Sequence, residues 1–161
     1  MYSELILRMM AHDRGNPQLI QHFLKVHAFS RLIGLQEGLD EKTQRIVEIA
    51  AIVHDIGILP SLQVYGDDTG PHQEELGPAE AESMLYALGY DEETVRRVCL
   101  LVSRHHTYTD ILGMDHQILI EADFLVNLFE NQSSLDAVTH AEQSIFATIT
   151  GKALLHTQFN L

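Results

Sequence analysis

The stretch AAIVHDIG at residues 50–57 decides the fold, because apolar residues run directly into a histidine and a carboxylate. Upstream, apolar side chains recur at the spacing of one helix face, at Ile46, Ile49, Ala50 and Val53. Burying His54 and Asp55 at the end of such a face costs free energy unless partner groups stabilise them. The stretch therefore predicts a core helix that ends in a polar site.

Helical signals extend from this segment in both directions. An amphipathic helix is predicted at the N-terminus, and Asn16 followed by Pro17 indicates the start of a second. The remaining helices are predicted from about 41 to 57, from 78 to 89, after Asp91, from 115 to 130, and once or twice beyond 134. No segment alternates with period two, so we predict an all-α bundle of about six to eight helices.

Residues 57–77 are the exception to this pattern. The segment contains two of the four prolines and four of the ten glycines, and Pro78 follows it directly. A connection of this length is usually a functional lid or binding loop, and the alternative is a mobile surface loop.

Composition limits the domain count and the partners. The 161 residues show no linker, so residues 1–161 are predicted to form a single domain. Cys99 is the single cysteine, which fits the reducing cytoplasm. A formal charge of −13 disfavours nucleic-acid polymers and anionic membranes, and no membrane span is predicted. We therefore expect a small-molecule partner; the oligomeric state is left open.

Several ionisable side chains fall on the apolar helix faces. They are His27, His54, His105, His106 and Asp123. Taken singly, an inward histidine is more often a hydrogen-bonded core residue than a ligand. Four helices that each direct such a group inward favour a divalent metal, because imidazole and carboxylate suit Fe, Mn, Zn or Ni.

The motif VHDIG at 53–57, with His27 upstream and EADFLVN at 121–127 downstream, resembles the HD-domain metal-dependent phosphohydrolases. The resemblance covers about residues 20–130, and helices from 134 to 161 would complete the bundle. It implies an H…HD…D ligand set around one metal ion. That set maps onto His27, His54, Asp55 and Asp123.

Some members of this family hold a second metal through additional histidines. The motif SRHHTYTD places His106, and next to it His105, at one of those positions. The other position is occupied by Gln73, with His72, Glu74 and Glu75 nearby. The resemblance therefore implies one tight divalent ion (Fe, Mn, Zn, Ni or Mg) and, if present, a weaker second one held by His105, His106, His72 and Glu74.

The residues that would meet a phosphate are harder to assign. Ile58 stands where many family members have lysine, so positive charge must come from elsewhere. Arg31 and Arg104 are the candidates for substrate binding, although each is more typical of a surface ion pair. Tyr108 is expected to shape the pocket.

The predicted function is metal-dependent hydrolysis of a phosphomonoester or phosphodiester in a small metabolite or nucleotide. Asp55 would orient or deprotonate water, and His105 or His106 would protonate the leaving group. One alternative is a diiron oxygenase with the same fold, against which Gln73 counts. Another is a non-catalytic module that binds a metal or nucleotide, which Ile58 and the few basic residues favour.

Overall fold

The structure is a computed structural model that describes residues 2–161, and these residues form nine α-helices and no β-strand. The prediction of an all-α fold is confirmed. The helices are α1 (Tyr2–His12), α2 (Pro17–Gln36), α3 (Glu41–Val53), α4 (Ile58–Tyr65), α5 (Gly70–Ala87), α6 (Glu92–Val102), α7 (Met114–Glu130), α8 (Leu135–Ser144) and α9 (Ile149–Phe159).

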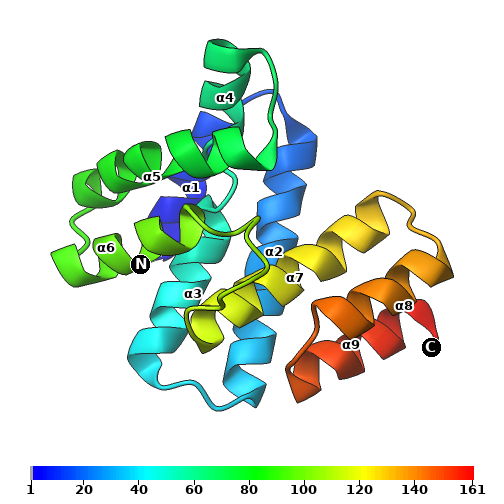
Figure 1. Cartoon of the computed structure of the whole chain (residues 1–161). Coiled ribbons are helices and arrows are strands. Elements are labelled where there is room, and N and C mark those ends of the chain that lie inside the picture. The colour runs from blue at the N-terminus through cyan, green and yellow to red at the C-terminus, as the bar shows by residue number, and fades with distance from the viewer. Residues whose placement is uncertain (1) are drawn as a thin grey trace.

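Helices α2, α3 and α7 form the centre of the bundle (Figure 1), where α2 packs against both of the others. The α5–α6 pair lies on one side of this centre and α8–α9 on the other. α6 packs on α3, and α9 packs on α7. Because the central helices meet side by side, polar groups on their facing sides can converge.

Side-chain caps start the helices that the sequence predicted most clearly. The Asn16 side chain accepts a hydrogen bond from the Leu19 amide, with Pro17 in the first turn of α2. The Asp40 carboxylate accepts from the amides of Lys42 and Thr43 at the start of α3. These contacts satisfy backbone donors that have no partner within the helix.

The predicted long loop at 57–77 is wrong. Residues 58–65 form α4, and α5 begins at Gly70 and continues through Pro78. Pro71 lies in the first turn of α5, where its missing N–H costs no hydrogen bond.

The glycines of this segment serve close packing rather than flexibility. A Cβ on Gly57 would lie 2.6 Å from the Gln73 carbonyl oxygen, and one on Gly77 would lie 2.9 Å from a methyl carbon of Val102. A side chain at position 57 would push α5 away from the end of α3, and one at position 77 would push α5 away from α6. The same density of glycine that suggested a loop therefore brings α5 close to His54 and Asp55.

One described stretch, Glu41–Tyr65, has the length and composition to cross a membrane, with a mean hydropathy of 1.4 in its apolar window. The fold buries 72% of that window. Within the stretch, α3 and α4 are separate helices joined by a turn at 54–57. Its hydropathy is therefore that of a core element.

Glu121, in the EAD motif, anchors the C-terminal helices. Its fully buried carboxylate accepts hydrogen bonds from the amides of Ala147 and Thr148, at 2.7 and 2.9 Å, just before α9. A Cβ on Gly151 would lie 1.9 Å from the same carboxylate, so only glycine fits there. This residue of the motif fixes the packing of α9 on α7.

Candidate metal centre

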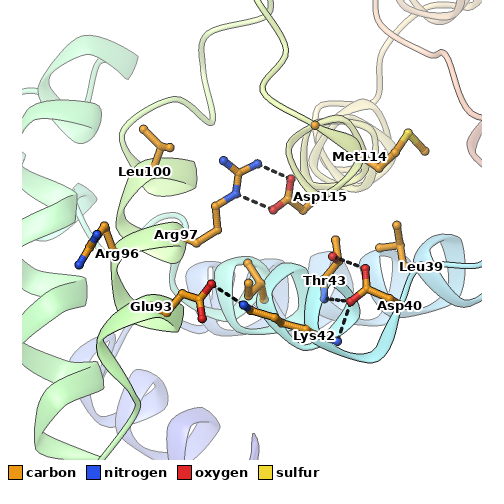
Figure 2. Close-up of a pocket in the computed structure, with 12 residues that line it drawn as sticks. Leu39, Asp40, Lys42, Thr43, Glu93, Arg96, Arg97, Leu100, Met114 and Asp115 are labelled. Atoms are coloured by element: carbon orange, nitrogen blue, oxygen red, sulfur yellow. Dashed lines mark hydrogen bonds and ion pairs between the residues drawn. The ribbon is translucent and has the colours of Figure 1, made fainter.

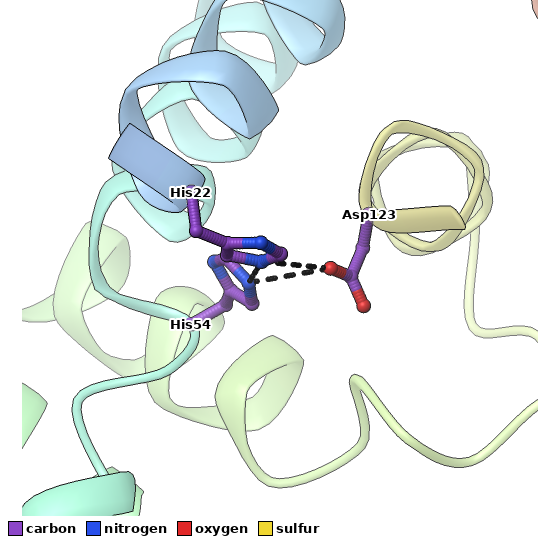
Figure 3. Close-up of side chains that lie close together, drawn as sticks. All are labelled: His22, His54 and Asp123. Carbon is purple, nitrogen blue, oxygen red and sulfur yellow. Dashed lines mark hydrogen bonds and ion pairs between the residues drawn. The ribbon is translucent and has the colours of Figure 1, made fainter. Parts of the chain in front are cut away.

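Three buried side chains converge where α2, α3 and α7 meet (Figure 3): His22, His54 and Asp123. His22 Nε2 lies 3.0 Å from Asp123 Oδ1 and 3.3 Å from His54 Nε2. His54 Nε2 lies 3.6 Å from the same carboxylate oxygen. Each side chain comes from a different helix, so only the packing of the bundle brings them together.

Asp55 completes this group of four. Its Oδ2 lies 3.3 Å from His22 Nε2 and 3.4 Å from His54 Nε2. Two ligands about 2.1 Å from one ion are separated by about 3.0 Å at a right angle and about 3.4 Å at a tetrahedral angle. The spacing of these nitrogen and oxygen atoms therefore fits a shared metal ion.

Neighbouring groups fix the orientation of the imidazoles. The Nδ1 of His54 lies 2.9 Å from the Ala51 carbonyl oxygen, to which it donates, and the Nδ1 of His22 lies 2.9 Å from Glu130 Oε2. A proton kept on Nδ1 leaves Nε2, which faces the cluster, as the atom that would bind a cation once its own proton is displaced. Such outer hydrogen bonds are typical of metal-ligating histidines.

The electrostatics of the group call for positive charge. Burial lowers the pKa of His54, but Asp55 and Asp123 outweigh this effect and raise that pKa well above its ordinary value. Burial likewise opposes ionisation of Asp55, whereas His54 and His105 hold the pKa of Asp55 well below its ordinary value. Among residues 2–161, neither of these two buried carboxylates pairs with a lysine or arginine, and a proton on His54 balances part of their charge when no metal is bound. A divalent cation would neutralise them.

A second group adjoins the first through Asp55. It consists of Asp55, His105 and His106. His105 Nδ1 donates to the Val102 carbonyl oxygen at 2.7 Å, as His54 does to Ala51. Its buried Nε2 has no hydrogen-bond partner among residues 2–161 and lies 3.4 Å from Asp55 Oδ1. An orphaned buried acceptor aimed at a carboxylate fits a metal ligand.

A sequence model of the HD domain matches residues 19–143. The chain belongs to the HD-domain family. The match includes every residue of both groups and extends beyond the predicted core of 20–130. No curated protein matches the chain significantly.

One crystal structure shares the HD-domain fold. It is a predicted HD superfamily hydrolase from an uncultured Thermotogales bacterium, with 24% sequence identity and a TM-score of 0.67. The similarity covers 98% of this chain and 84% of that protein. At this level of identity it supports the arrangement of the helices.

The structure does not bring His27 to the HD-domain cluster, and His22 lies there instead. His27 Nε2 is 3.3 Å from Glu48 Oε2. Five residues of α-helix correspond to a rotation of about 140°, so the two histidines cannot face the same neighbours. The prediction that placed His27 with His54, Asp55 and Asp123 is corrected on this geometry.

Two of the residues predicted for the second metal lie elsewhere. The His72 ring stacks on Tyr65, with ring centres 3.9 Å apart, and its Nδ1 lies 2.6 Å from Asp67. Glu74 accepts hydrogen bonds from the His106 amide and the Thr107 hydroxyl, each at 2.9 Å. Glu74 therefore holds the turn that carries the histidine pair. Neither side chain joins the Asp55 group, because both are engaged by closer partners.

Gln73 approaches the site instead of its two neighbours. Its Oε1 lies 3.2 Å from His106 Nε2, and its Nε2 donates to the Asp68 carbonyl oxygen at 2.6 Å. Burial and the neighbouring His105 lower the pKa of His106 to about 4, so this imidazole is neutral near pH 7. A neutral imidazole beside an amide oxygen is suited to bind a cation rather than to donate a proton.

The candidate substrate residues are dispersed. Arg31 lies on the opposite side of α2 from His22 and donates to both Glu48 oxygens, at 3.1 and 3.2 Å. Arg104 donates to the Thr109 carbonyl oxygen within its own loop. Tyr108 alone reaches the HD-domain centre, with its hydroxyl 3.3 Å from His106 Nδ1. No arginine lines the cavity at the cluster.

That cavity has a volume of about 210 Å³. Its lining consists of Gln18, Leu19, His22, Asp55, Ile58, Gln73, His106, Asp123, Asn127 and Glu130. Asn127 donates to Asp123 Oδ1 at 2.8 Å, one turn along α7. Carboxylates, imidazoles and amides therefore form most of the cavity wall, with Leu19 and Ile58 as its apolar part.

A larger cavity, of about 730 Å³, lies elsewhere, between α3, α6 and α7 (Figure 2). Its charged side chains neutralise one another. Arg97 forms a two-pronged ion pair with Asp115, at 2.7 and 2.8 Å, and Lys42 pairs with Glu93. Arg97 and Lys42 are therefore already paired with carboxylates of the protein. The clustered histidine and aspartate side chains lie at the smaller cavity instead.

Sequence reasoning missed His22, Asn127 and Glu130, and it counted Gln73 against a second metal instead of assigning it to the site. A signal for His22 was present, because His22, Val26, Ser30 and Ile33 follow the helical spacing of the buried stripe of α2. Asn127 lies one turn after Asp123 and could have been paired with it in the same way. Glu130 carries no such local signal, since its partner His22 lies on another helix.

Proposed function

We propose that this HD-domain protein is a metal-dependent phosphohydrolase that acts on a small phosphorylated metabolite or nucleotide in the cytoplasm. The observation that carries the proposal is that the Nε2 atoms of His22 and His54 lie 3.3 Å apart and each lies 3.0 to 3.6 Å from an oxygen of Asp55 and of Asp123. Membership of a family of mostly hydrolytic proteins supports it.

These four residues would hold a divalent ion of the Fe, Mn, Zn, Ni or Mg type. When bound, the ion would polarise a phosphoryl oxygen and acidify water. Asp55 is the member of the group that faces both clusters, and its side chain is 14% exposed toward the cavity. It is therefore placed to orient water or accept its proton, while the more deeply buried Asp123 and His54 hold position.

A second, weaker ion would be held by Asp55, His105 and His106, with Gln73 in place of a further imidazole. An amide oxygen is a neutral donor, so this group offers less negative charge than the first. We expect metal titration of stripped protein to show one tight site and one weaker site. His106→Ala should remove the weaker site alone.

Charge supports a small substrate. The chain carries −13, and no arginine or lysine lines the cavity at the centre. A nucleic-acid polymer or an anionic membrane would be repelled over its whole length. A single phosphoryl group needs only the bound cation.

The test is hydrolysis of p-nitrophenyl phosphate and a panel of phosphate esters by metal-free protein reloaded with Mn²⁺. We expect turnover that requires the metal and is lost in Asp55→Ala. Lys152→Ala, on exposed α9, is the matched control and should retain activity. Failure of wild-type protein to hydrolyse any ester at full metal occupancy would refute the proposal and favour a non-catalytic binding module.

A diiron oxygenase is the second candidate, because Asp55 connects the two metal-ligand groups. It requires two tightly bound irons and consumption of O₂. Elemental analysis of protein purified without added metal separates the two candidates. One ion per chain, or two ions that are not iron, would exclude the oxygenase.

A further inference from the structure

Beside the metal cavity lies a second, larger cavity of about 550 Å³. The start of α2 and the end of α7 bound it, and its lining consists of Pro17, Gln18, Gln21, Lys25, Glu130 and Asn131. Gln18 and Glu130 line both cavities. The two spaces are therefore neighbours, with Gln18 and Glu130 at their common boundary.

The lining of this α2–α7 groove is polar and electrically balanced. Lys25 Nζ and Glu130 Oε1 pair at 2.6 Å, while the other oxygen of Glu130 holds His22 Nδ1. The remaining polar side chains are the exposed amides of Gln18, Gln21 and Asn131. An amide side chain offers both donors and an acceptor, which suits hydroxyl groups and heterocyclic rings.

Volume indicates that the two cavities work together. Pockets that enclose a metabolite-sized ligand typically measure about 300–1,000 Å³. The cavity at the metal centre, about 210 Å³, is below that range and suits a phosphoryl group alone. The rest of a substrate would have to lie in the adjoining groove.

We propose that the α2–α7 groove is the subsite for the uncharged, hydrogen-bonding part of a phosphomonoester, either a sugar or a nucleoside. This proposal rests on the proposed function, and it assigns recognition to Gln18, Gln21 and Asn131. It also sets a charge limit. A second phosphate in the groove would meet only Lys25, which Glu130 already neutralises, so monophosphates are favoured over diphosphates and triphosphates.

The first experiment measures binding to Mn²⁺-loaded protein. The probes are inorganic phosphate, glucose 6-phosphate, and adenosine mono-, di- and triphosphate. We expect at least one of the two monophosphate esters to bind about tenfold or more tightly than inorganic phosphate, and the di- and triphosphates to bind more weakly than the monophosphate. The tighter of the two esters distinguishes a sugar subsite from a nucleoside subsite.

The second experiment removes the amides. Gln21→Ala and Asn131→Ala should each reduce the preference for that ester over inorganic phosphate by roughly fivefold, which corresponds to about 1 kcal/mol for one hydrogen bond. Gln36→Ala, an exposed glutamine at the far end of α2, should leave the preference unchanged. Gln21 and Asn131 are both exposed, so the melting temperatures of their alanine variants should remain near that of the wild type.

The outcomes separate this proposal from the proposed function. An unchanged preference in both amide variants, or tighter binding of the triphosphate, would overturn the subsite. If the amide variants lose the preference for the ester over inorganic phosphate but wild-type protein hydrolyses no ester, the subsite assignment stands and the hydrolase proposal is refuted. If neither ester binds more tightly than inorganic phosphate, the groove does not recognise the substrate.

Discussion

Two buried polar clusters lie along the same helices, and only one of them needs a cation. The metal centre contains His22 of α2 and His54 at the end of α3. The second, which we call the Glu48 cluster, contains His27 and Arg31 of α2 with Gln44 and Glu48 of α3. Both combine histidine with a buried carboxylate.

The difference between them is the balance of charge. Glu48 accepts hydrogen bonds from Arg31 and, at 2.7 Å, from the Gln44 amide, so its negative charge is matched within the protein. Burial lowers the pKa of His27, only partly offset by Glu48, and this histidine stays neutral. At the metal centre, among residues 2–161, two carboxylates meet imidazoles and the Asn127 amide, with no arginine or lysine paired to them. An inward histidine near an acid therefore indicates a metal site only where no arginine or lysine neutralises the acid.

The largest expected effect separates the two histidines of α2. His22→Ala should lower the affinity for the first metal ion by at least about 100-fold, because it removes one of the four proposed ligands. His27→Ala should leave metal affinity within about twofold, since its ring contacts Glu48 instead. Metal content after dialysis, measured by elemental analysis, checks both. Equal losses in the two variants would remove the distinction between the clusters.

The free energy of unfolding, unlike metal affinity, should depend on the Glu48 cluster. Glu48→Ala should lower the free energy of unfolding by roughly 1–3 kcal/mol, because the buried Gln44 amide keeps only its longer contact to the Arg31 carbonyl oxygen and the half-exposed Arg31 side chain loses its partner. Metal affinity should persist. Denaturant unfolding of stripped protein provides the measurement. Glu41→Ala, on the exposed first turn of α3, is the control and should cost less than about 1 kcal/mol.

A smaller effect is expected from the residue that orients His22. Glu130→Gln replaces the carboxylate that holds His22 Nδ1 with an amide. Loss of such outer partners typically lowers metal affinity about 10- to 100-fold. Competition with a chelator of known affinity would measure it. Glu142→Gln, which removes a surface partner of His156, should leave metal affinity at the wild-type value. An unaltered affinity in Glu130→Gln would show that the negative charge of Glu130 is not needed to orient His22, since the glutamine amide oxygen can still accept from Nδ1.

The smallest effect concerns the pH dependence of the Glu48 cluster. The pKa of His27 is lower in the folded protein than in the unfolded chain, so the unfolded state binds more protons as pH falls through the ordinary histidine range. His27 therefore contributes stability above that range, which is lost on acidification. The slope of unfolding free energy against pH should be shallower in His27→Gln than in wild type, with both proteins free of metal. A steeper slope would contradict the neutral assignment of His27.

The sequence by itself determined the helical class and most helix starts, and it identified three of the four residues that we propose as ligands of the first metal. Caps such as Asn16 and Asp40 act through hydrogen bonds to residues two or three positions away, so local sequence suffices to locate them. His54 and Asp55 follow a continuous apolar stripe, and Asp123 lies on another. For His54 and Asp123 the apolar helix face indicated burial, whereas Asp55 was identified from the HD motif.

Only the tertiary structure decided which histidine of α2 completes the site and which groups surround it. His22 and His27 are both compatible with a buried face, and the choice depends on how α2 rotates between α3 and α7. Gln73 reaches the site because glycines at 57 and 77 let α5 approach closely, whereas their composition alone suggested a loop. Glu130 meets His22 across 108 residues of sequence. Packing between helices sets these contacts, and the periodicity of a single helix carries no information about the partner that will face it.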